Sequence, residues 1–317
     1  MDLIDRKIIC ELDENCRIPT SQLAKKLKLG RNVVDYRIKK LEEEQVIQSF
    51  ISTIDLGKIG YTTYRIYLKT NYATAHQSFL DYVKEHKNII HCLKTEGYYT
   101  YTLAIAVRSI HELDILLMDL RRNFKELITA HDLSILLYTK IFKLNKLLLE
   151  QKDKIIKTRE FSVENTTVSL DEKDKKILHA LAQQANLSVI QIAKNTKLSI
   201  DIVKYRLKNL NKQLITANRP IFNLNKLGYY HYVIMLKTKP ITPQDQTKFD
   251  TWCTLKKNIL YYGKRIGRFD FELNVAIKDI DDLNCFFKEL NKEFGSIIER
   301  YELIINTNLV KLNYLPL

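Results

Sequence analysis

The chain has 317 residues, and its 51 Lys and Arg against 37 Asp and Glu give a formal net charge of +14, which favours polyanions such as nucleic acid as partners. Its five cysteines are scattered and odd in number, which excludes a disulfide framework or a zinc knuckle as the basis of the fold. No apolar run is long enough to span a bilayer and the charged start MDLIDRKIIC is unlike a signal peptide, so we expect a cytoplasmic protein with no membrane partner.

A repeated motif indicates two similar halves. RNVVDYRIKKLEEE at 31–44 returns as IDIVKYRLKNLNK at 200–212, and three short helices fit the surroundings of both copies. In the first helix of the first copy, for example, Ile8, Ile9 and Leu12 form one apolar face. In the second copy, Ser188 and Gln191 have the spacing of a capping box at the start of the second helix. Two short helices, the second with a polar and basic outer face, predict a helix-turn-helix whose last helix enters the major groove of DNA.

The outer face of that last helix supplies the candidate DNA-binding residues. They are Arg31, Asn32, Asp35, Tyr36, Arg37, Lys39 and Lys40 in the first copy and Lys204, Tyr205, Arg206 and Lys208 in the second. For Arg37 and Arg206 two roles stay open, namely a phosphate contact and an ion pair that orients the helix. Arg31 and Asn32 suit guanine and adenine, whereas the second copy has neither side chain at this place. We therefore expect an asymmetric site that the first unit reads and on which the second unit holds phosphates.

Each helical unit is followed by a second repeated region. Its Tyr-, Ile- and Val-rich segments read as strands and its amphipathic segments as helices. Strands are expected at 58–70 and 226–238, strand pairs around Gly97 and Gly267, helices at 75–86, 110–124 and 280–294, and last strands at 132–144 and 301–315. The order β-α-β-β-α-β is ferredoxin-like. The predicted fold class is therefore α+β, with two repeats of a winged helix-turn-helix followed by a ferredoxin-like domain.

The predicted domains follow the chain in this order. They are a winged helix-turn-helix at 1–48, a ferredoxin-like domain at 49–143, a linker at 144–169, a second winged helix-turn-helix at 170–217 and a second ferredoxin-like domain at 218–317. The first part of the linker has the apolar spacing of a helix.

Both helical units resemble the amino-terminal domain of the Lrp/AsnC family of transcriptional regulators. The motifs that carry this resemblance are IDRKII, LAKKLKL and YRIKKLEEEQVI, with their counterparts in the second half. The resemblance covers nearly the whole chain twice. It implies a tandem regulator that folds as an intramolecular pseudo-dimer, binds double-stranded DNA, and self-associates further through its ferredoxin-like regulatory (RAM) sheets. The family usually ends the second helix with Gly, where this chain has Lys28 and Lys197, so we expect a slightly remodelled turn.

The resemblance also implies a small effector, such as an amino acid, at a Gly-aromatic-Asp turn of the regulatory domain. The matching candidates are Gly97, Thr100, Gly267 and Asp270. A carboxylate can pair with an ammonium group and a hydroxyl cannot, so the two pockets should differ. In the alternative interpretation, the glycines only permit a turn and Asp270 caps it.

Two other functions stay open. Siroheme decarboxylases are built on a similar scaffold and would use basic and histidine side chains, for which His91, Lys94, His111 and His131 are conceivable. A protein that coats DNA without sequence preference is the other alternative. The retained recognition helices favour a regulator that is not an enzyme, and the sequence indicates no cofactor and no metal site.

Overall fold

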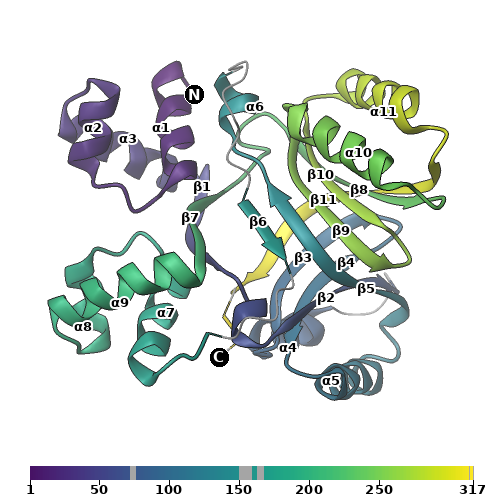
Figure 1. Ribbon diagram of the computed structural model, residues 1–317, viewed down its shortest axis with the longest axis horizontal. Helices are drawn as coiled ribbons and strands as arrows, with labels where there is room; N and C mark the ends of the chain where they lie inside the picture. Colours follow the sequence, from purple (N-terminus) through teal and green to yellow (C-terminus); the bar gives the residue numbers. More distant parts are fainter. Residues whose placement is uncertain (72–75, 150–158, 163–167, 314, 317) are drawn as a thin grey trace. The chain divides into compact units, whose positions relative to one another are not determined.

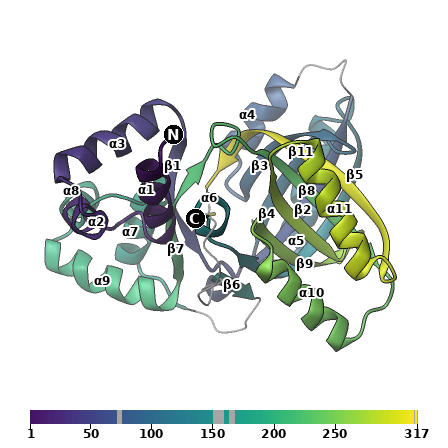
Figure 2. The same ribbon diagram turned by 90° about the horizontal axis from the view of Figure 1, so that it is seen from above.

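The computed structural model describes residues 1–71, 76–149, 159–162, 168–313 and 315–316. The chain divides into two compact units, and each unit contains parts of both repeats (Figures 1 and 2). Unit 1 takes its described residues from Met1–Asp55, Phe142–Arg159 and Val168–Gly228, and unit 2 from Leu56–Ile141, Glu160–Thr167 and Tyr229–Leu317. These units group like elements, whereas the predicted domains follow the chain, so the predicted boundaries stay a prediction.

Unit 1 contains the two trihelical bundles. Their helices are α1 (Leu3–Glu14), α2 (Thr20–Leu27) and α3 (Arg31–Glu43) in the first repeat, and α7 (Glu172–Gln183), α8 (Val189–Thr196) and α9 (Ile200–Gln213) in the second. The expected face of α1 is buried, with Ile8 and Ile9 fully inaccessible and Leu12 3% exposed. The predicted capping box of Ser188 and Gln191 begins α8. The three-helix prediction is confirmed in both halves.

A two-stranded sheet joins the bundles within unit 1. Strand β1 (Ile47–Ile54) pairs antiparallel with β7 (Ile215–Phe222). The loop after the first helix of each bundle binds the strand of the other repeat, since Cys16 N donates to Asn218 O at 2.9 Å and Ala185 N to Phe50 O at 3.1 Å. Because the two bonds are reciprocal, the bundles share one pseudo-symmetric joint.

The beginning of the linker packs on the first bundle only. As predicted, it is helical, as α6 (Asn145–Leu149), and its Leu147 and Leu148 are buried. Asp13 of α1 is 1% exposed and accepts a hydrogen bond from Leu144 N at 3.1 Å. The same carboxylate pairs with Arg219 of β7, with Nη2 to Oδ1 at 3.1 Å. Most of the predicted linker beyond α6 lies outside the described residues.

Unit 2 contains the two ferredoxin-like halves. The first consists of β2 (Thr62–Thr70), α4 (Gln77–Glu85), β3 (Ile89–Gly97), β4 (Tyr101–Val107), α5 (Ile110–Asn123) and β5 (Ile128–Ile141), and the second of β8 (Tyr230–Thr238), α10 (Pro243–Leu255), β9 (Ile259–Gly267), β10 (Phe271–Ile277), α11 (Ile280–Phe294) and β11 (Ile298–Leu312). The ferredoxin-like order is confirmed twice. The strand expected at 58–70 begins later, at Thr62, because Gly57–Ile59 forms the short 3₁₀ helix η1 and Gly60 ends it in a left-handed conformation.

In the described part of unit 2, eight strands close into a ring. Their order is β2-β4-β3-β11-β8-β10-β9-β5, and β5 pairs back to β2, while the short β6 (Arg159–Ser162) adds to β5. The two long last strands make this closure. Strand β5 pairs with β2 over Ile128–Ile135 and with β9 over Ser134–Ile141, and β11 likewise pairs first with β8 and then with β3. Each long strand therefore belongs to the sheets of both repeats.

The ring has an outer face covered by helices and an inner face where the repeats meet. On β2, Tyr64, Ile66 and Leu68 pack with residues of α4 and α5 in one apolar cluster. Tyr67 points to the opposite face, because side chains alternate along a strand, and packs there against Met235 and other residues of the second repeat. The inner face is therefore lined jointly by both repeats.

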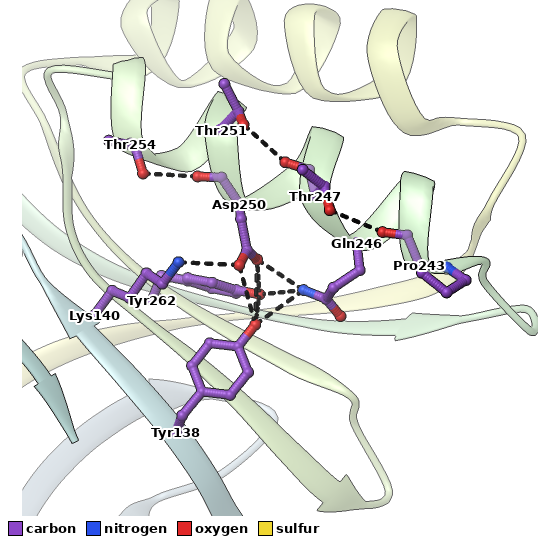
Figure 3. A network of polar contacts seen from close by, with 9 residues as sticks. All are labelled: Tyr138, Lys140, Pro243, Gln246, Thr247, Asp250, Thr251, Thr254 and Tyr262. Carbon is purple, nitrogen blue, oxygen red and sulfur yellow. Dashed lines mark hydrogen bonds and ion pairs between the residues drawn. The ribbon is translucent and has the colours of Figure 1, made fainter. Parts of the chain in front are cut away.

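A polar network holds the β5–β9 joint under α10 (Figure 3). The carboxylate of Asp250 accepts hydrogen bonds from Tyr262 OH at 2.6 Å, Gln246 Nε2 at 2.7 Å, Lys140 Nζ at 3.0 Å and Tyr138 OH at 3.2 Å. Tyr138 and Lys140 lie on β5 of the first repeat, and the other three on α10 and β9 of the second. Burial raises the pKa of Tyr138 to about 12, so its hydroxyl stays protonated. The network thus links the repeats at a single carboxylate.

All five cysteines are free thiols. None of the helices in the described ranges is long and apolar enough to cross a membrane.

Candidate nucleic-acid interface

The recognition helices α3 and α9 begin after tight left-handed turns. Lys28 has φ 56° and Lys197 φ 57°, and the backbone N–H of each donates back to the preceding helix. The expected remodelling of this turn was wrong. The chain keeps the left-handed geometry and accepts the cost of a side chain there, on the order of 1 kcal/mol. Ser199 then caps α9, since its hydroxyl accepts from Ile202 N at 3.4 Å.

The predicted contact residues on the outer faces of these helices lie in solvent. Tyr36 and Tyr205, at equivalent places, are 67% and 63% exposed. Apart from Arg37 and Arg206, the charged side chains form ion pairs along their own helices, as in Arg31–Asp35 at 3.4 Å, Lys39–Glu43 and Lys40–Glu44 at 3.7 Å, and Lys204–Asp201 at 3.8 Å. Asn32 and Lys208 are exposed as well. Such exposed pairs contribute little to stability, so these groups can exchange their partners for phosphates or base edges.

Arg37 and Arg206 differ from the other candidates because they are held inside each bundle. Arg37 Nη1 lies 2.7 Å from both Asp2 Oδ2 and Asp5 Oδ1. Arg206 makes the same pair of contacts with the aspartates that begin α7, at 2.8 and 3.1 Å. A hydrogen bond from Asp5 N, together with Arg37, lowers the pKa of Asp2. This geometry fits the alternative in which an ion pair orients the recognition helix.

The aspartates that receive these arginines also cap their own helices. Asp2 with Asp5, and Asp171 with Asp174, form reciprocal capping boxes at the starts of α1 and α7. Each arginine therefore fixes its recognition helix to the capped end of another helix. These two boxes were not predicted from the sequence, although their D-x-x-D spacing signals them.

Charge is distributed unequally between the bundles. Residues 1–55 contain ten basic and ten acidic side chains, whereas residues 168–228 contain eleven basic and four acidic ones. The electrostatic attraction to a phosphate backbone therefore comes mainly from the second bundle. This agrees with the predicted division between base reading and phosphate holding, which itself stays a prediction.

The predicted effector glycines lie where the long strands cross between the repeats. Gly97 has φ +119° and Gly267 φ +148°. A Cβ atom would lie 2.9 Å from Leu303 O at Gly97 and 2.6 Å from Leu133 O at Gly267. Both positions therefore need glycine for the backbone conformation and for the close approach of the other repeat.

The polar side chain at the end of each turn, Thr100 or Asp270, accepts a backbone hydrogen bond that holds the turn. Thr100 Oγ1 accepts from Thr70 N at 3.2 Å, and Asp270 Oδ2 accepts from the equivalent Thr238 N at 2.8 Å. The other oxygen of Asp270 accepts from Lys237 Nζ at 3.1 Å. The interpretation in which Asp270 caps the turn fits this geometry, and the effector role of the four residues stays a prediction.

Arg268, which our sequence analysis did not select, connects the two turns. Its guanidinium donates to Asp132 Oδ2 at 2.9 Å and to Glu302 Oε1 at 2.8 Å, which come from β5 and β11. It also lies over the ring of Tyr98, which occupies the equivalent place in the first turn, with Cζ 4.9 Å from the centroid. An effector binding between the turns would have to share this space with Arg268.

The residues considered for a tetrapyrrole site are not brought together. His91 of β3 contacts Arg65 at 3.2 Å on the inner face, whereas His131 of β5 contacts Arg121 of α5 on the outer one. His111 and Lys94 are exposed. Within the described ranges no group of three or more His, Cys, Asp or Glu side chains could hold a metal ion.

Comparison with known proteins supports the helix-turn-helix interpretation of both bundles. Residues 1–48 match a model of winged helix-turn-helix DNA-binding domains, and residues 170–211 match a model of the AsnC-type helix-turn-helix domain. The proline dehydrogenase transcriptional activator of Rhodobacter capsulatus is 32% identical over 115 residues, which are 35% of this chain and 75% of that protein. The HTH-type transcriptional regulator LrpC of Bacillus subtilis is 28% identical over 114 residues, 36% of this chain and 79% of its own length.

A crystal structure of the siroheme decarboxylase NirDL is similar over 99% of this chain and 94% of its own, with a TM-score of 0.64 and 13% sequence identity. That similarity concerns the fold. The family follows from the helix-turn-helix matches of both bundles and from the curated relatives. The chain belongs to the Lrp/AsnC family of transcriptional regulators.

Proposed function

We propose that the chain is a tandem regulator that binds a specific double-stranded DNA site with both helix-turn-helix bundles at once. The observation that supports this most directly is the joint in unit 1, where β1 pairs with β7 and each bundle hydrogen-bonds to the strand of the other repeat. The two repeats then do in one chain what two subunits do in a dimer.

Tethering changes what each bundle has to supply. Once one bundle is bound, the other meets its half-site at an effective concentration on the order of millimolar, so weak individual contacts suffice. The half-sites would lie about one helical turn, ~34 Å, or a multiple of it apart. The first bundle, with Arg31 and Asn32 exposed, reads bases, and the more basic second bundle holds phosphates. The preferred site is therefore asymmetric.

A small effector belongs to the proposal, but the turns alone do not specify it. Both oxygens of Asp270 already accept hydrogen bonds, and Arg268 bridges the two turns. An amino acid that binds there would displace Arg268 from Asp132 or Glu302, and its ammonium group would take the place of the guanidinium.

We also propose that the chain is not an enzyme. The histidines considered for a decarboxylase lie on different faces of the ring, and both recognition helices keep exposed contact residues. Tetrapyrrole absorbance in the purified protein, or binding of an added iron porphyrin at micromolar concentration, would favour the decarboxylase alternative instead.

Repeated selection from random duplex DNA, with the salt dependence of the enriched pool, tests the proposal. We expect an asymmetric motif covering two major-groove faces. Asn32→Ala should relax base preference, while Lys208→Gln in the second bundle should weaken binding to all sequences alike. Enrichment of a perfect palindrome would contradict the division of roles. Steep salt dependence without any enriched motif would mean a protein that coats DNA.

A further inference from the structure

Two guanidinium groups face one carboxylate on the inner face of the ring in unit 2. Arg265 is 3% exposed and Glu272 4%, and Nε of the arginine lies 2.9 Å from Oε2 of the glutamate. Tyr67 OH and Asn274 Nδ2 donate to the same carboxylate at 2.9 and 3.1 Å. Burial opposes ionisation of Glu272, but Arg265 and Arg65 outweigh it and lower its pKa to about 2. Glu272 is therefore an anion whose partners are already in place.

Arg65 is the second guanidinium, and within the described residues no carboxylate lies at hydrogen-bonding distance from it. Its Nη2 lies 3.7 Å from Glu272 Oε1, although its side chain is only 14% exposed. Among the described residues its hydrogen-bond partner is His91, whose Nδ1 lies 3.2 Å from Nη1. A guanidinium can only donate, so His91 accepts at Nδ1 and is neutral. Its Nε2–H is then a second donor beside Arg65.

The other histidine of this region is also neutral. His231 Nδ1 lies 3.1 Å from Asn306 Nδ2 and accepts from it, and Nε2 lies 2.9 Å from Asn274 Oδ1 and donates to it. Burial is the main cause that lowers the pKa of His231 to about 4. The cluster therefore carries two positive charges and one negative charge, so Arg65, 3.7 Å from a carboxylate that it shares with Arg265, is only partly compensated, which is costly for a largely buried charge.

The residues beside Arg65 on the neighbouring strands are small, and two polar atoms on the inner face have no hydrogen-bond partner among the described residues. Arg65 pairs across the strands with Ala104 of β4 and with Ser134 of β5. In the part of the chain that the structure describes, the hydroxyl of Ser134, which is 2% exposed, has no hydrogen-bond partner, and neither has the side-chain carbonyl oxygen of Asn306. A ligand that adds an anionic group and a hydrogen-bond donor would satisfy all of these groups.

We propose that the inner face around Arg65 binds a small organic acid, whose carboxylate pairs with the Arg65 guanidinium and the His91 Nε2–H. A hydroxyl or ammonium group of the same molecule then meets Ser134 or Asn306. This deepens the proposed function by giving the regulator an effector site away from the two turns. The site is tested without DNA, so its failure and a failure of DNA binding are distinguishable.

The opposite balance at Arg268 supplies a matched control. There one guanidinium pairs with two carboxylates, Asp132 and Glu302, at 2.9 and 2.8 Å, so an added anion gains nothing. Arg65→Gln and Arg268→Gln each remove one guanidinium from the ring, but only the first removes the proposed anion partner.

The experiment is thermal unfolding of the full chain with glycolate and acetate, which have no ammonium group to replace the Arg268 guanidinium, against acetamide, at constant ionic strength. We expect the acids, but not acetamide, to raise the Tm of the wild type and of Arg268→Gln. Arg65→Gln should need at least tenfold more acid for the same shift, and Arg65→Lys should lie between, because it keeps the charge but loses the planar fork. Circular dichroism confirms that each variant is folded.

Two results would overturn the proposal. One is the absence of any shift by the two acids in the wild type, and the other is an equal shift in Arg65→Gln. If Arg65→Gln does not fold, the comparison of Arg65→Lys with the wild type decides between the two outcomes.

Discussion

Removing the carboxylate of Asp250 should weaken unit 2 substantially. In Asp250→Ala the two tyrosine hydroxyls, the Gln246 amide and the Lys140 ammonium lose their shared acceptor. A hydrogen bond to a charged group contributes about 1.5–3 kcal/mol. Tyr138 and Tyr262 can still bond to each other at 3.0 Å, and Lys140, 18% exposed, can reach water. Counting the loss of about two such bonds gives a destabilisation of about 3–6 kcal/mol.

The chain supplies its own probe for this measurement. Trp252, the only tryptophan, lies in the same helix and packs on Phe286 and Phe294, with ring centroids 5.6 and 5.5 Å apart. Its fluorescence during urea unfolding reports on α10 and α11. Thr251→Ala is the control, because Thr251 is exposed and bonds only along the helix, and we expect it to change stability by less than about 0.5 kcal/mol.

A second variant separates the charge from the hydrogen bonds. Asp250→Asn keeps the shape and one acceptor, so it should lose about half as much free energy as Asp250→Ala. A loss below about 1 kcal/mol in Asp250→Ala, or one equal to that of Thr251→Ala, would refute the reasoning that the network stabilises the joint.

Three further predictions concern other parts of the chain. Burial lowers the pKa of His231 to about 4 in the folded chain. Below about pH 6.5 the unfolded chain therefore binds a proton at His231 that the folded chain does not bind, and the free energy of unfolding falls as the pH falls. His231→Gln should flatten this decline by up to about 1.4 kcal/mol per pH unit between pH 6 and 5 in urea unfolding, and an unchanged slope would contradict it. Neutralising Lys204 and Lys208 together should reduce the slope of log K against log salt by about 1.8 without altering the selected motif, whereas a changed motif would mean that they read bases. Gly267→Ala should lower the Tm more than Gly228→Ala, since both have positive φ but only the first meets a backbone oxygen, and equal losses would speak against the close approach.

Local signals account for what the sequence predicts well. The buried face of α1, the cap at Ser188 and the ferredoxin-like order follow from spacing within a dozen residues. Helix α10 was missed despite its capping box at Thr242 and Asp245, because its apolar residues do not follow a clear helical period. A cap alone was too weak a signal.

Long-range pairing accounts for what the sequence does not predict. Strand β7 contains Pro220 and gives no hint that β1 is its partner, 168 residues earlier at Arg219 and Ile51. Arg268 reads as an ordinary turn residue until β5 and β11 bring carboxylates to it. The contacts of Arg268 depend on the closed ring and the β1–β7 pair joins the two repeats, and periodicity along one strand specifies neither.

The crossing of β5 and β11 between the repeats also bears on how the chain is made. Strand β3 pairs with β4 along one edge and with β11 along the other, for example Gly97 with Ile304. The strand that covers this second edge is therefore synthesised about 200 residues later. At ordinary rates of translation the second edge of β3 in the first ferredoxin-like half stays unpaired for roughly 10–40 s. During this interval a neighbouring nascent chain could supply the missing strand, so the ring that holds one molecule together is also the place where two molecules would exchange parts.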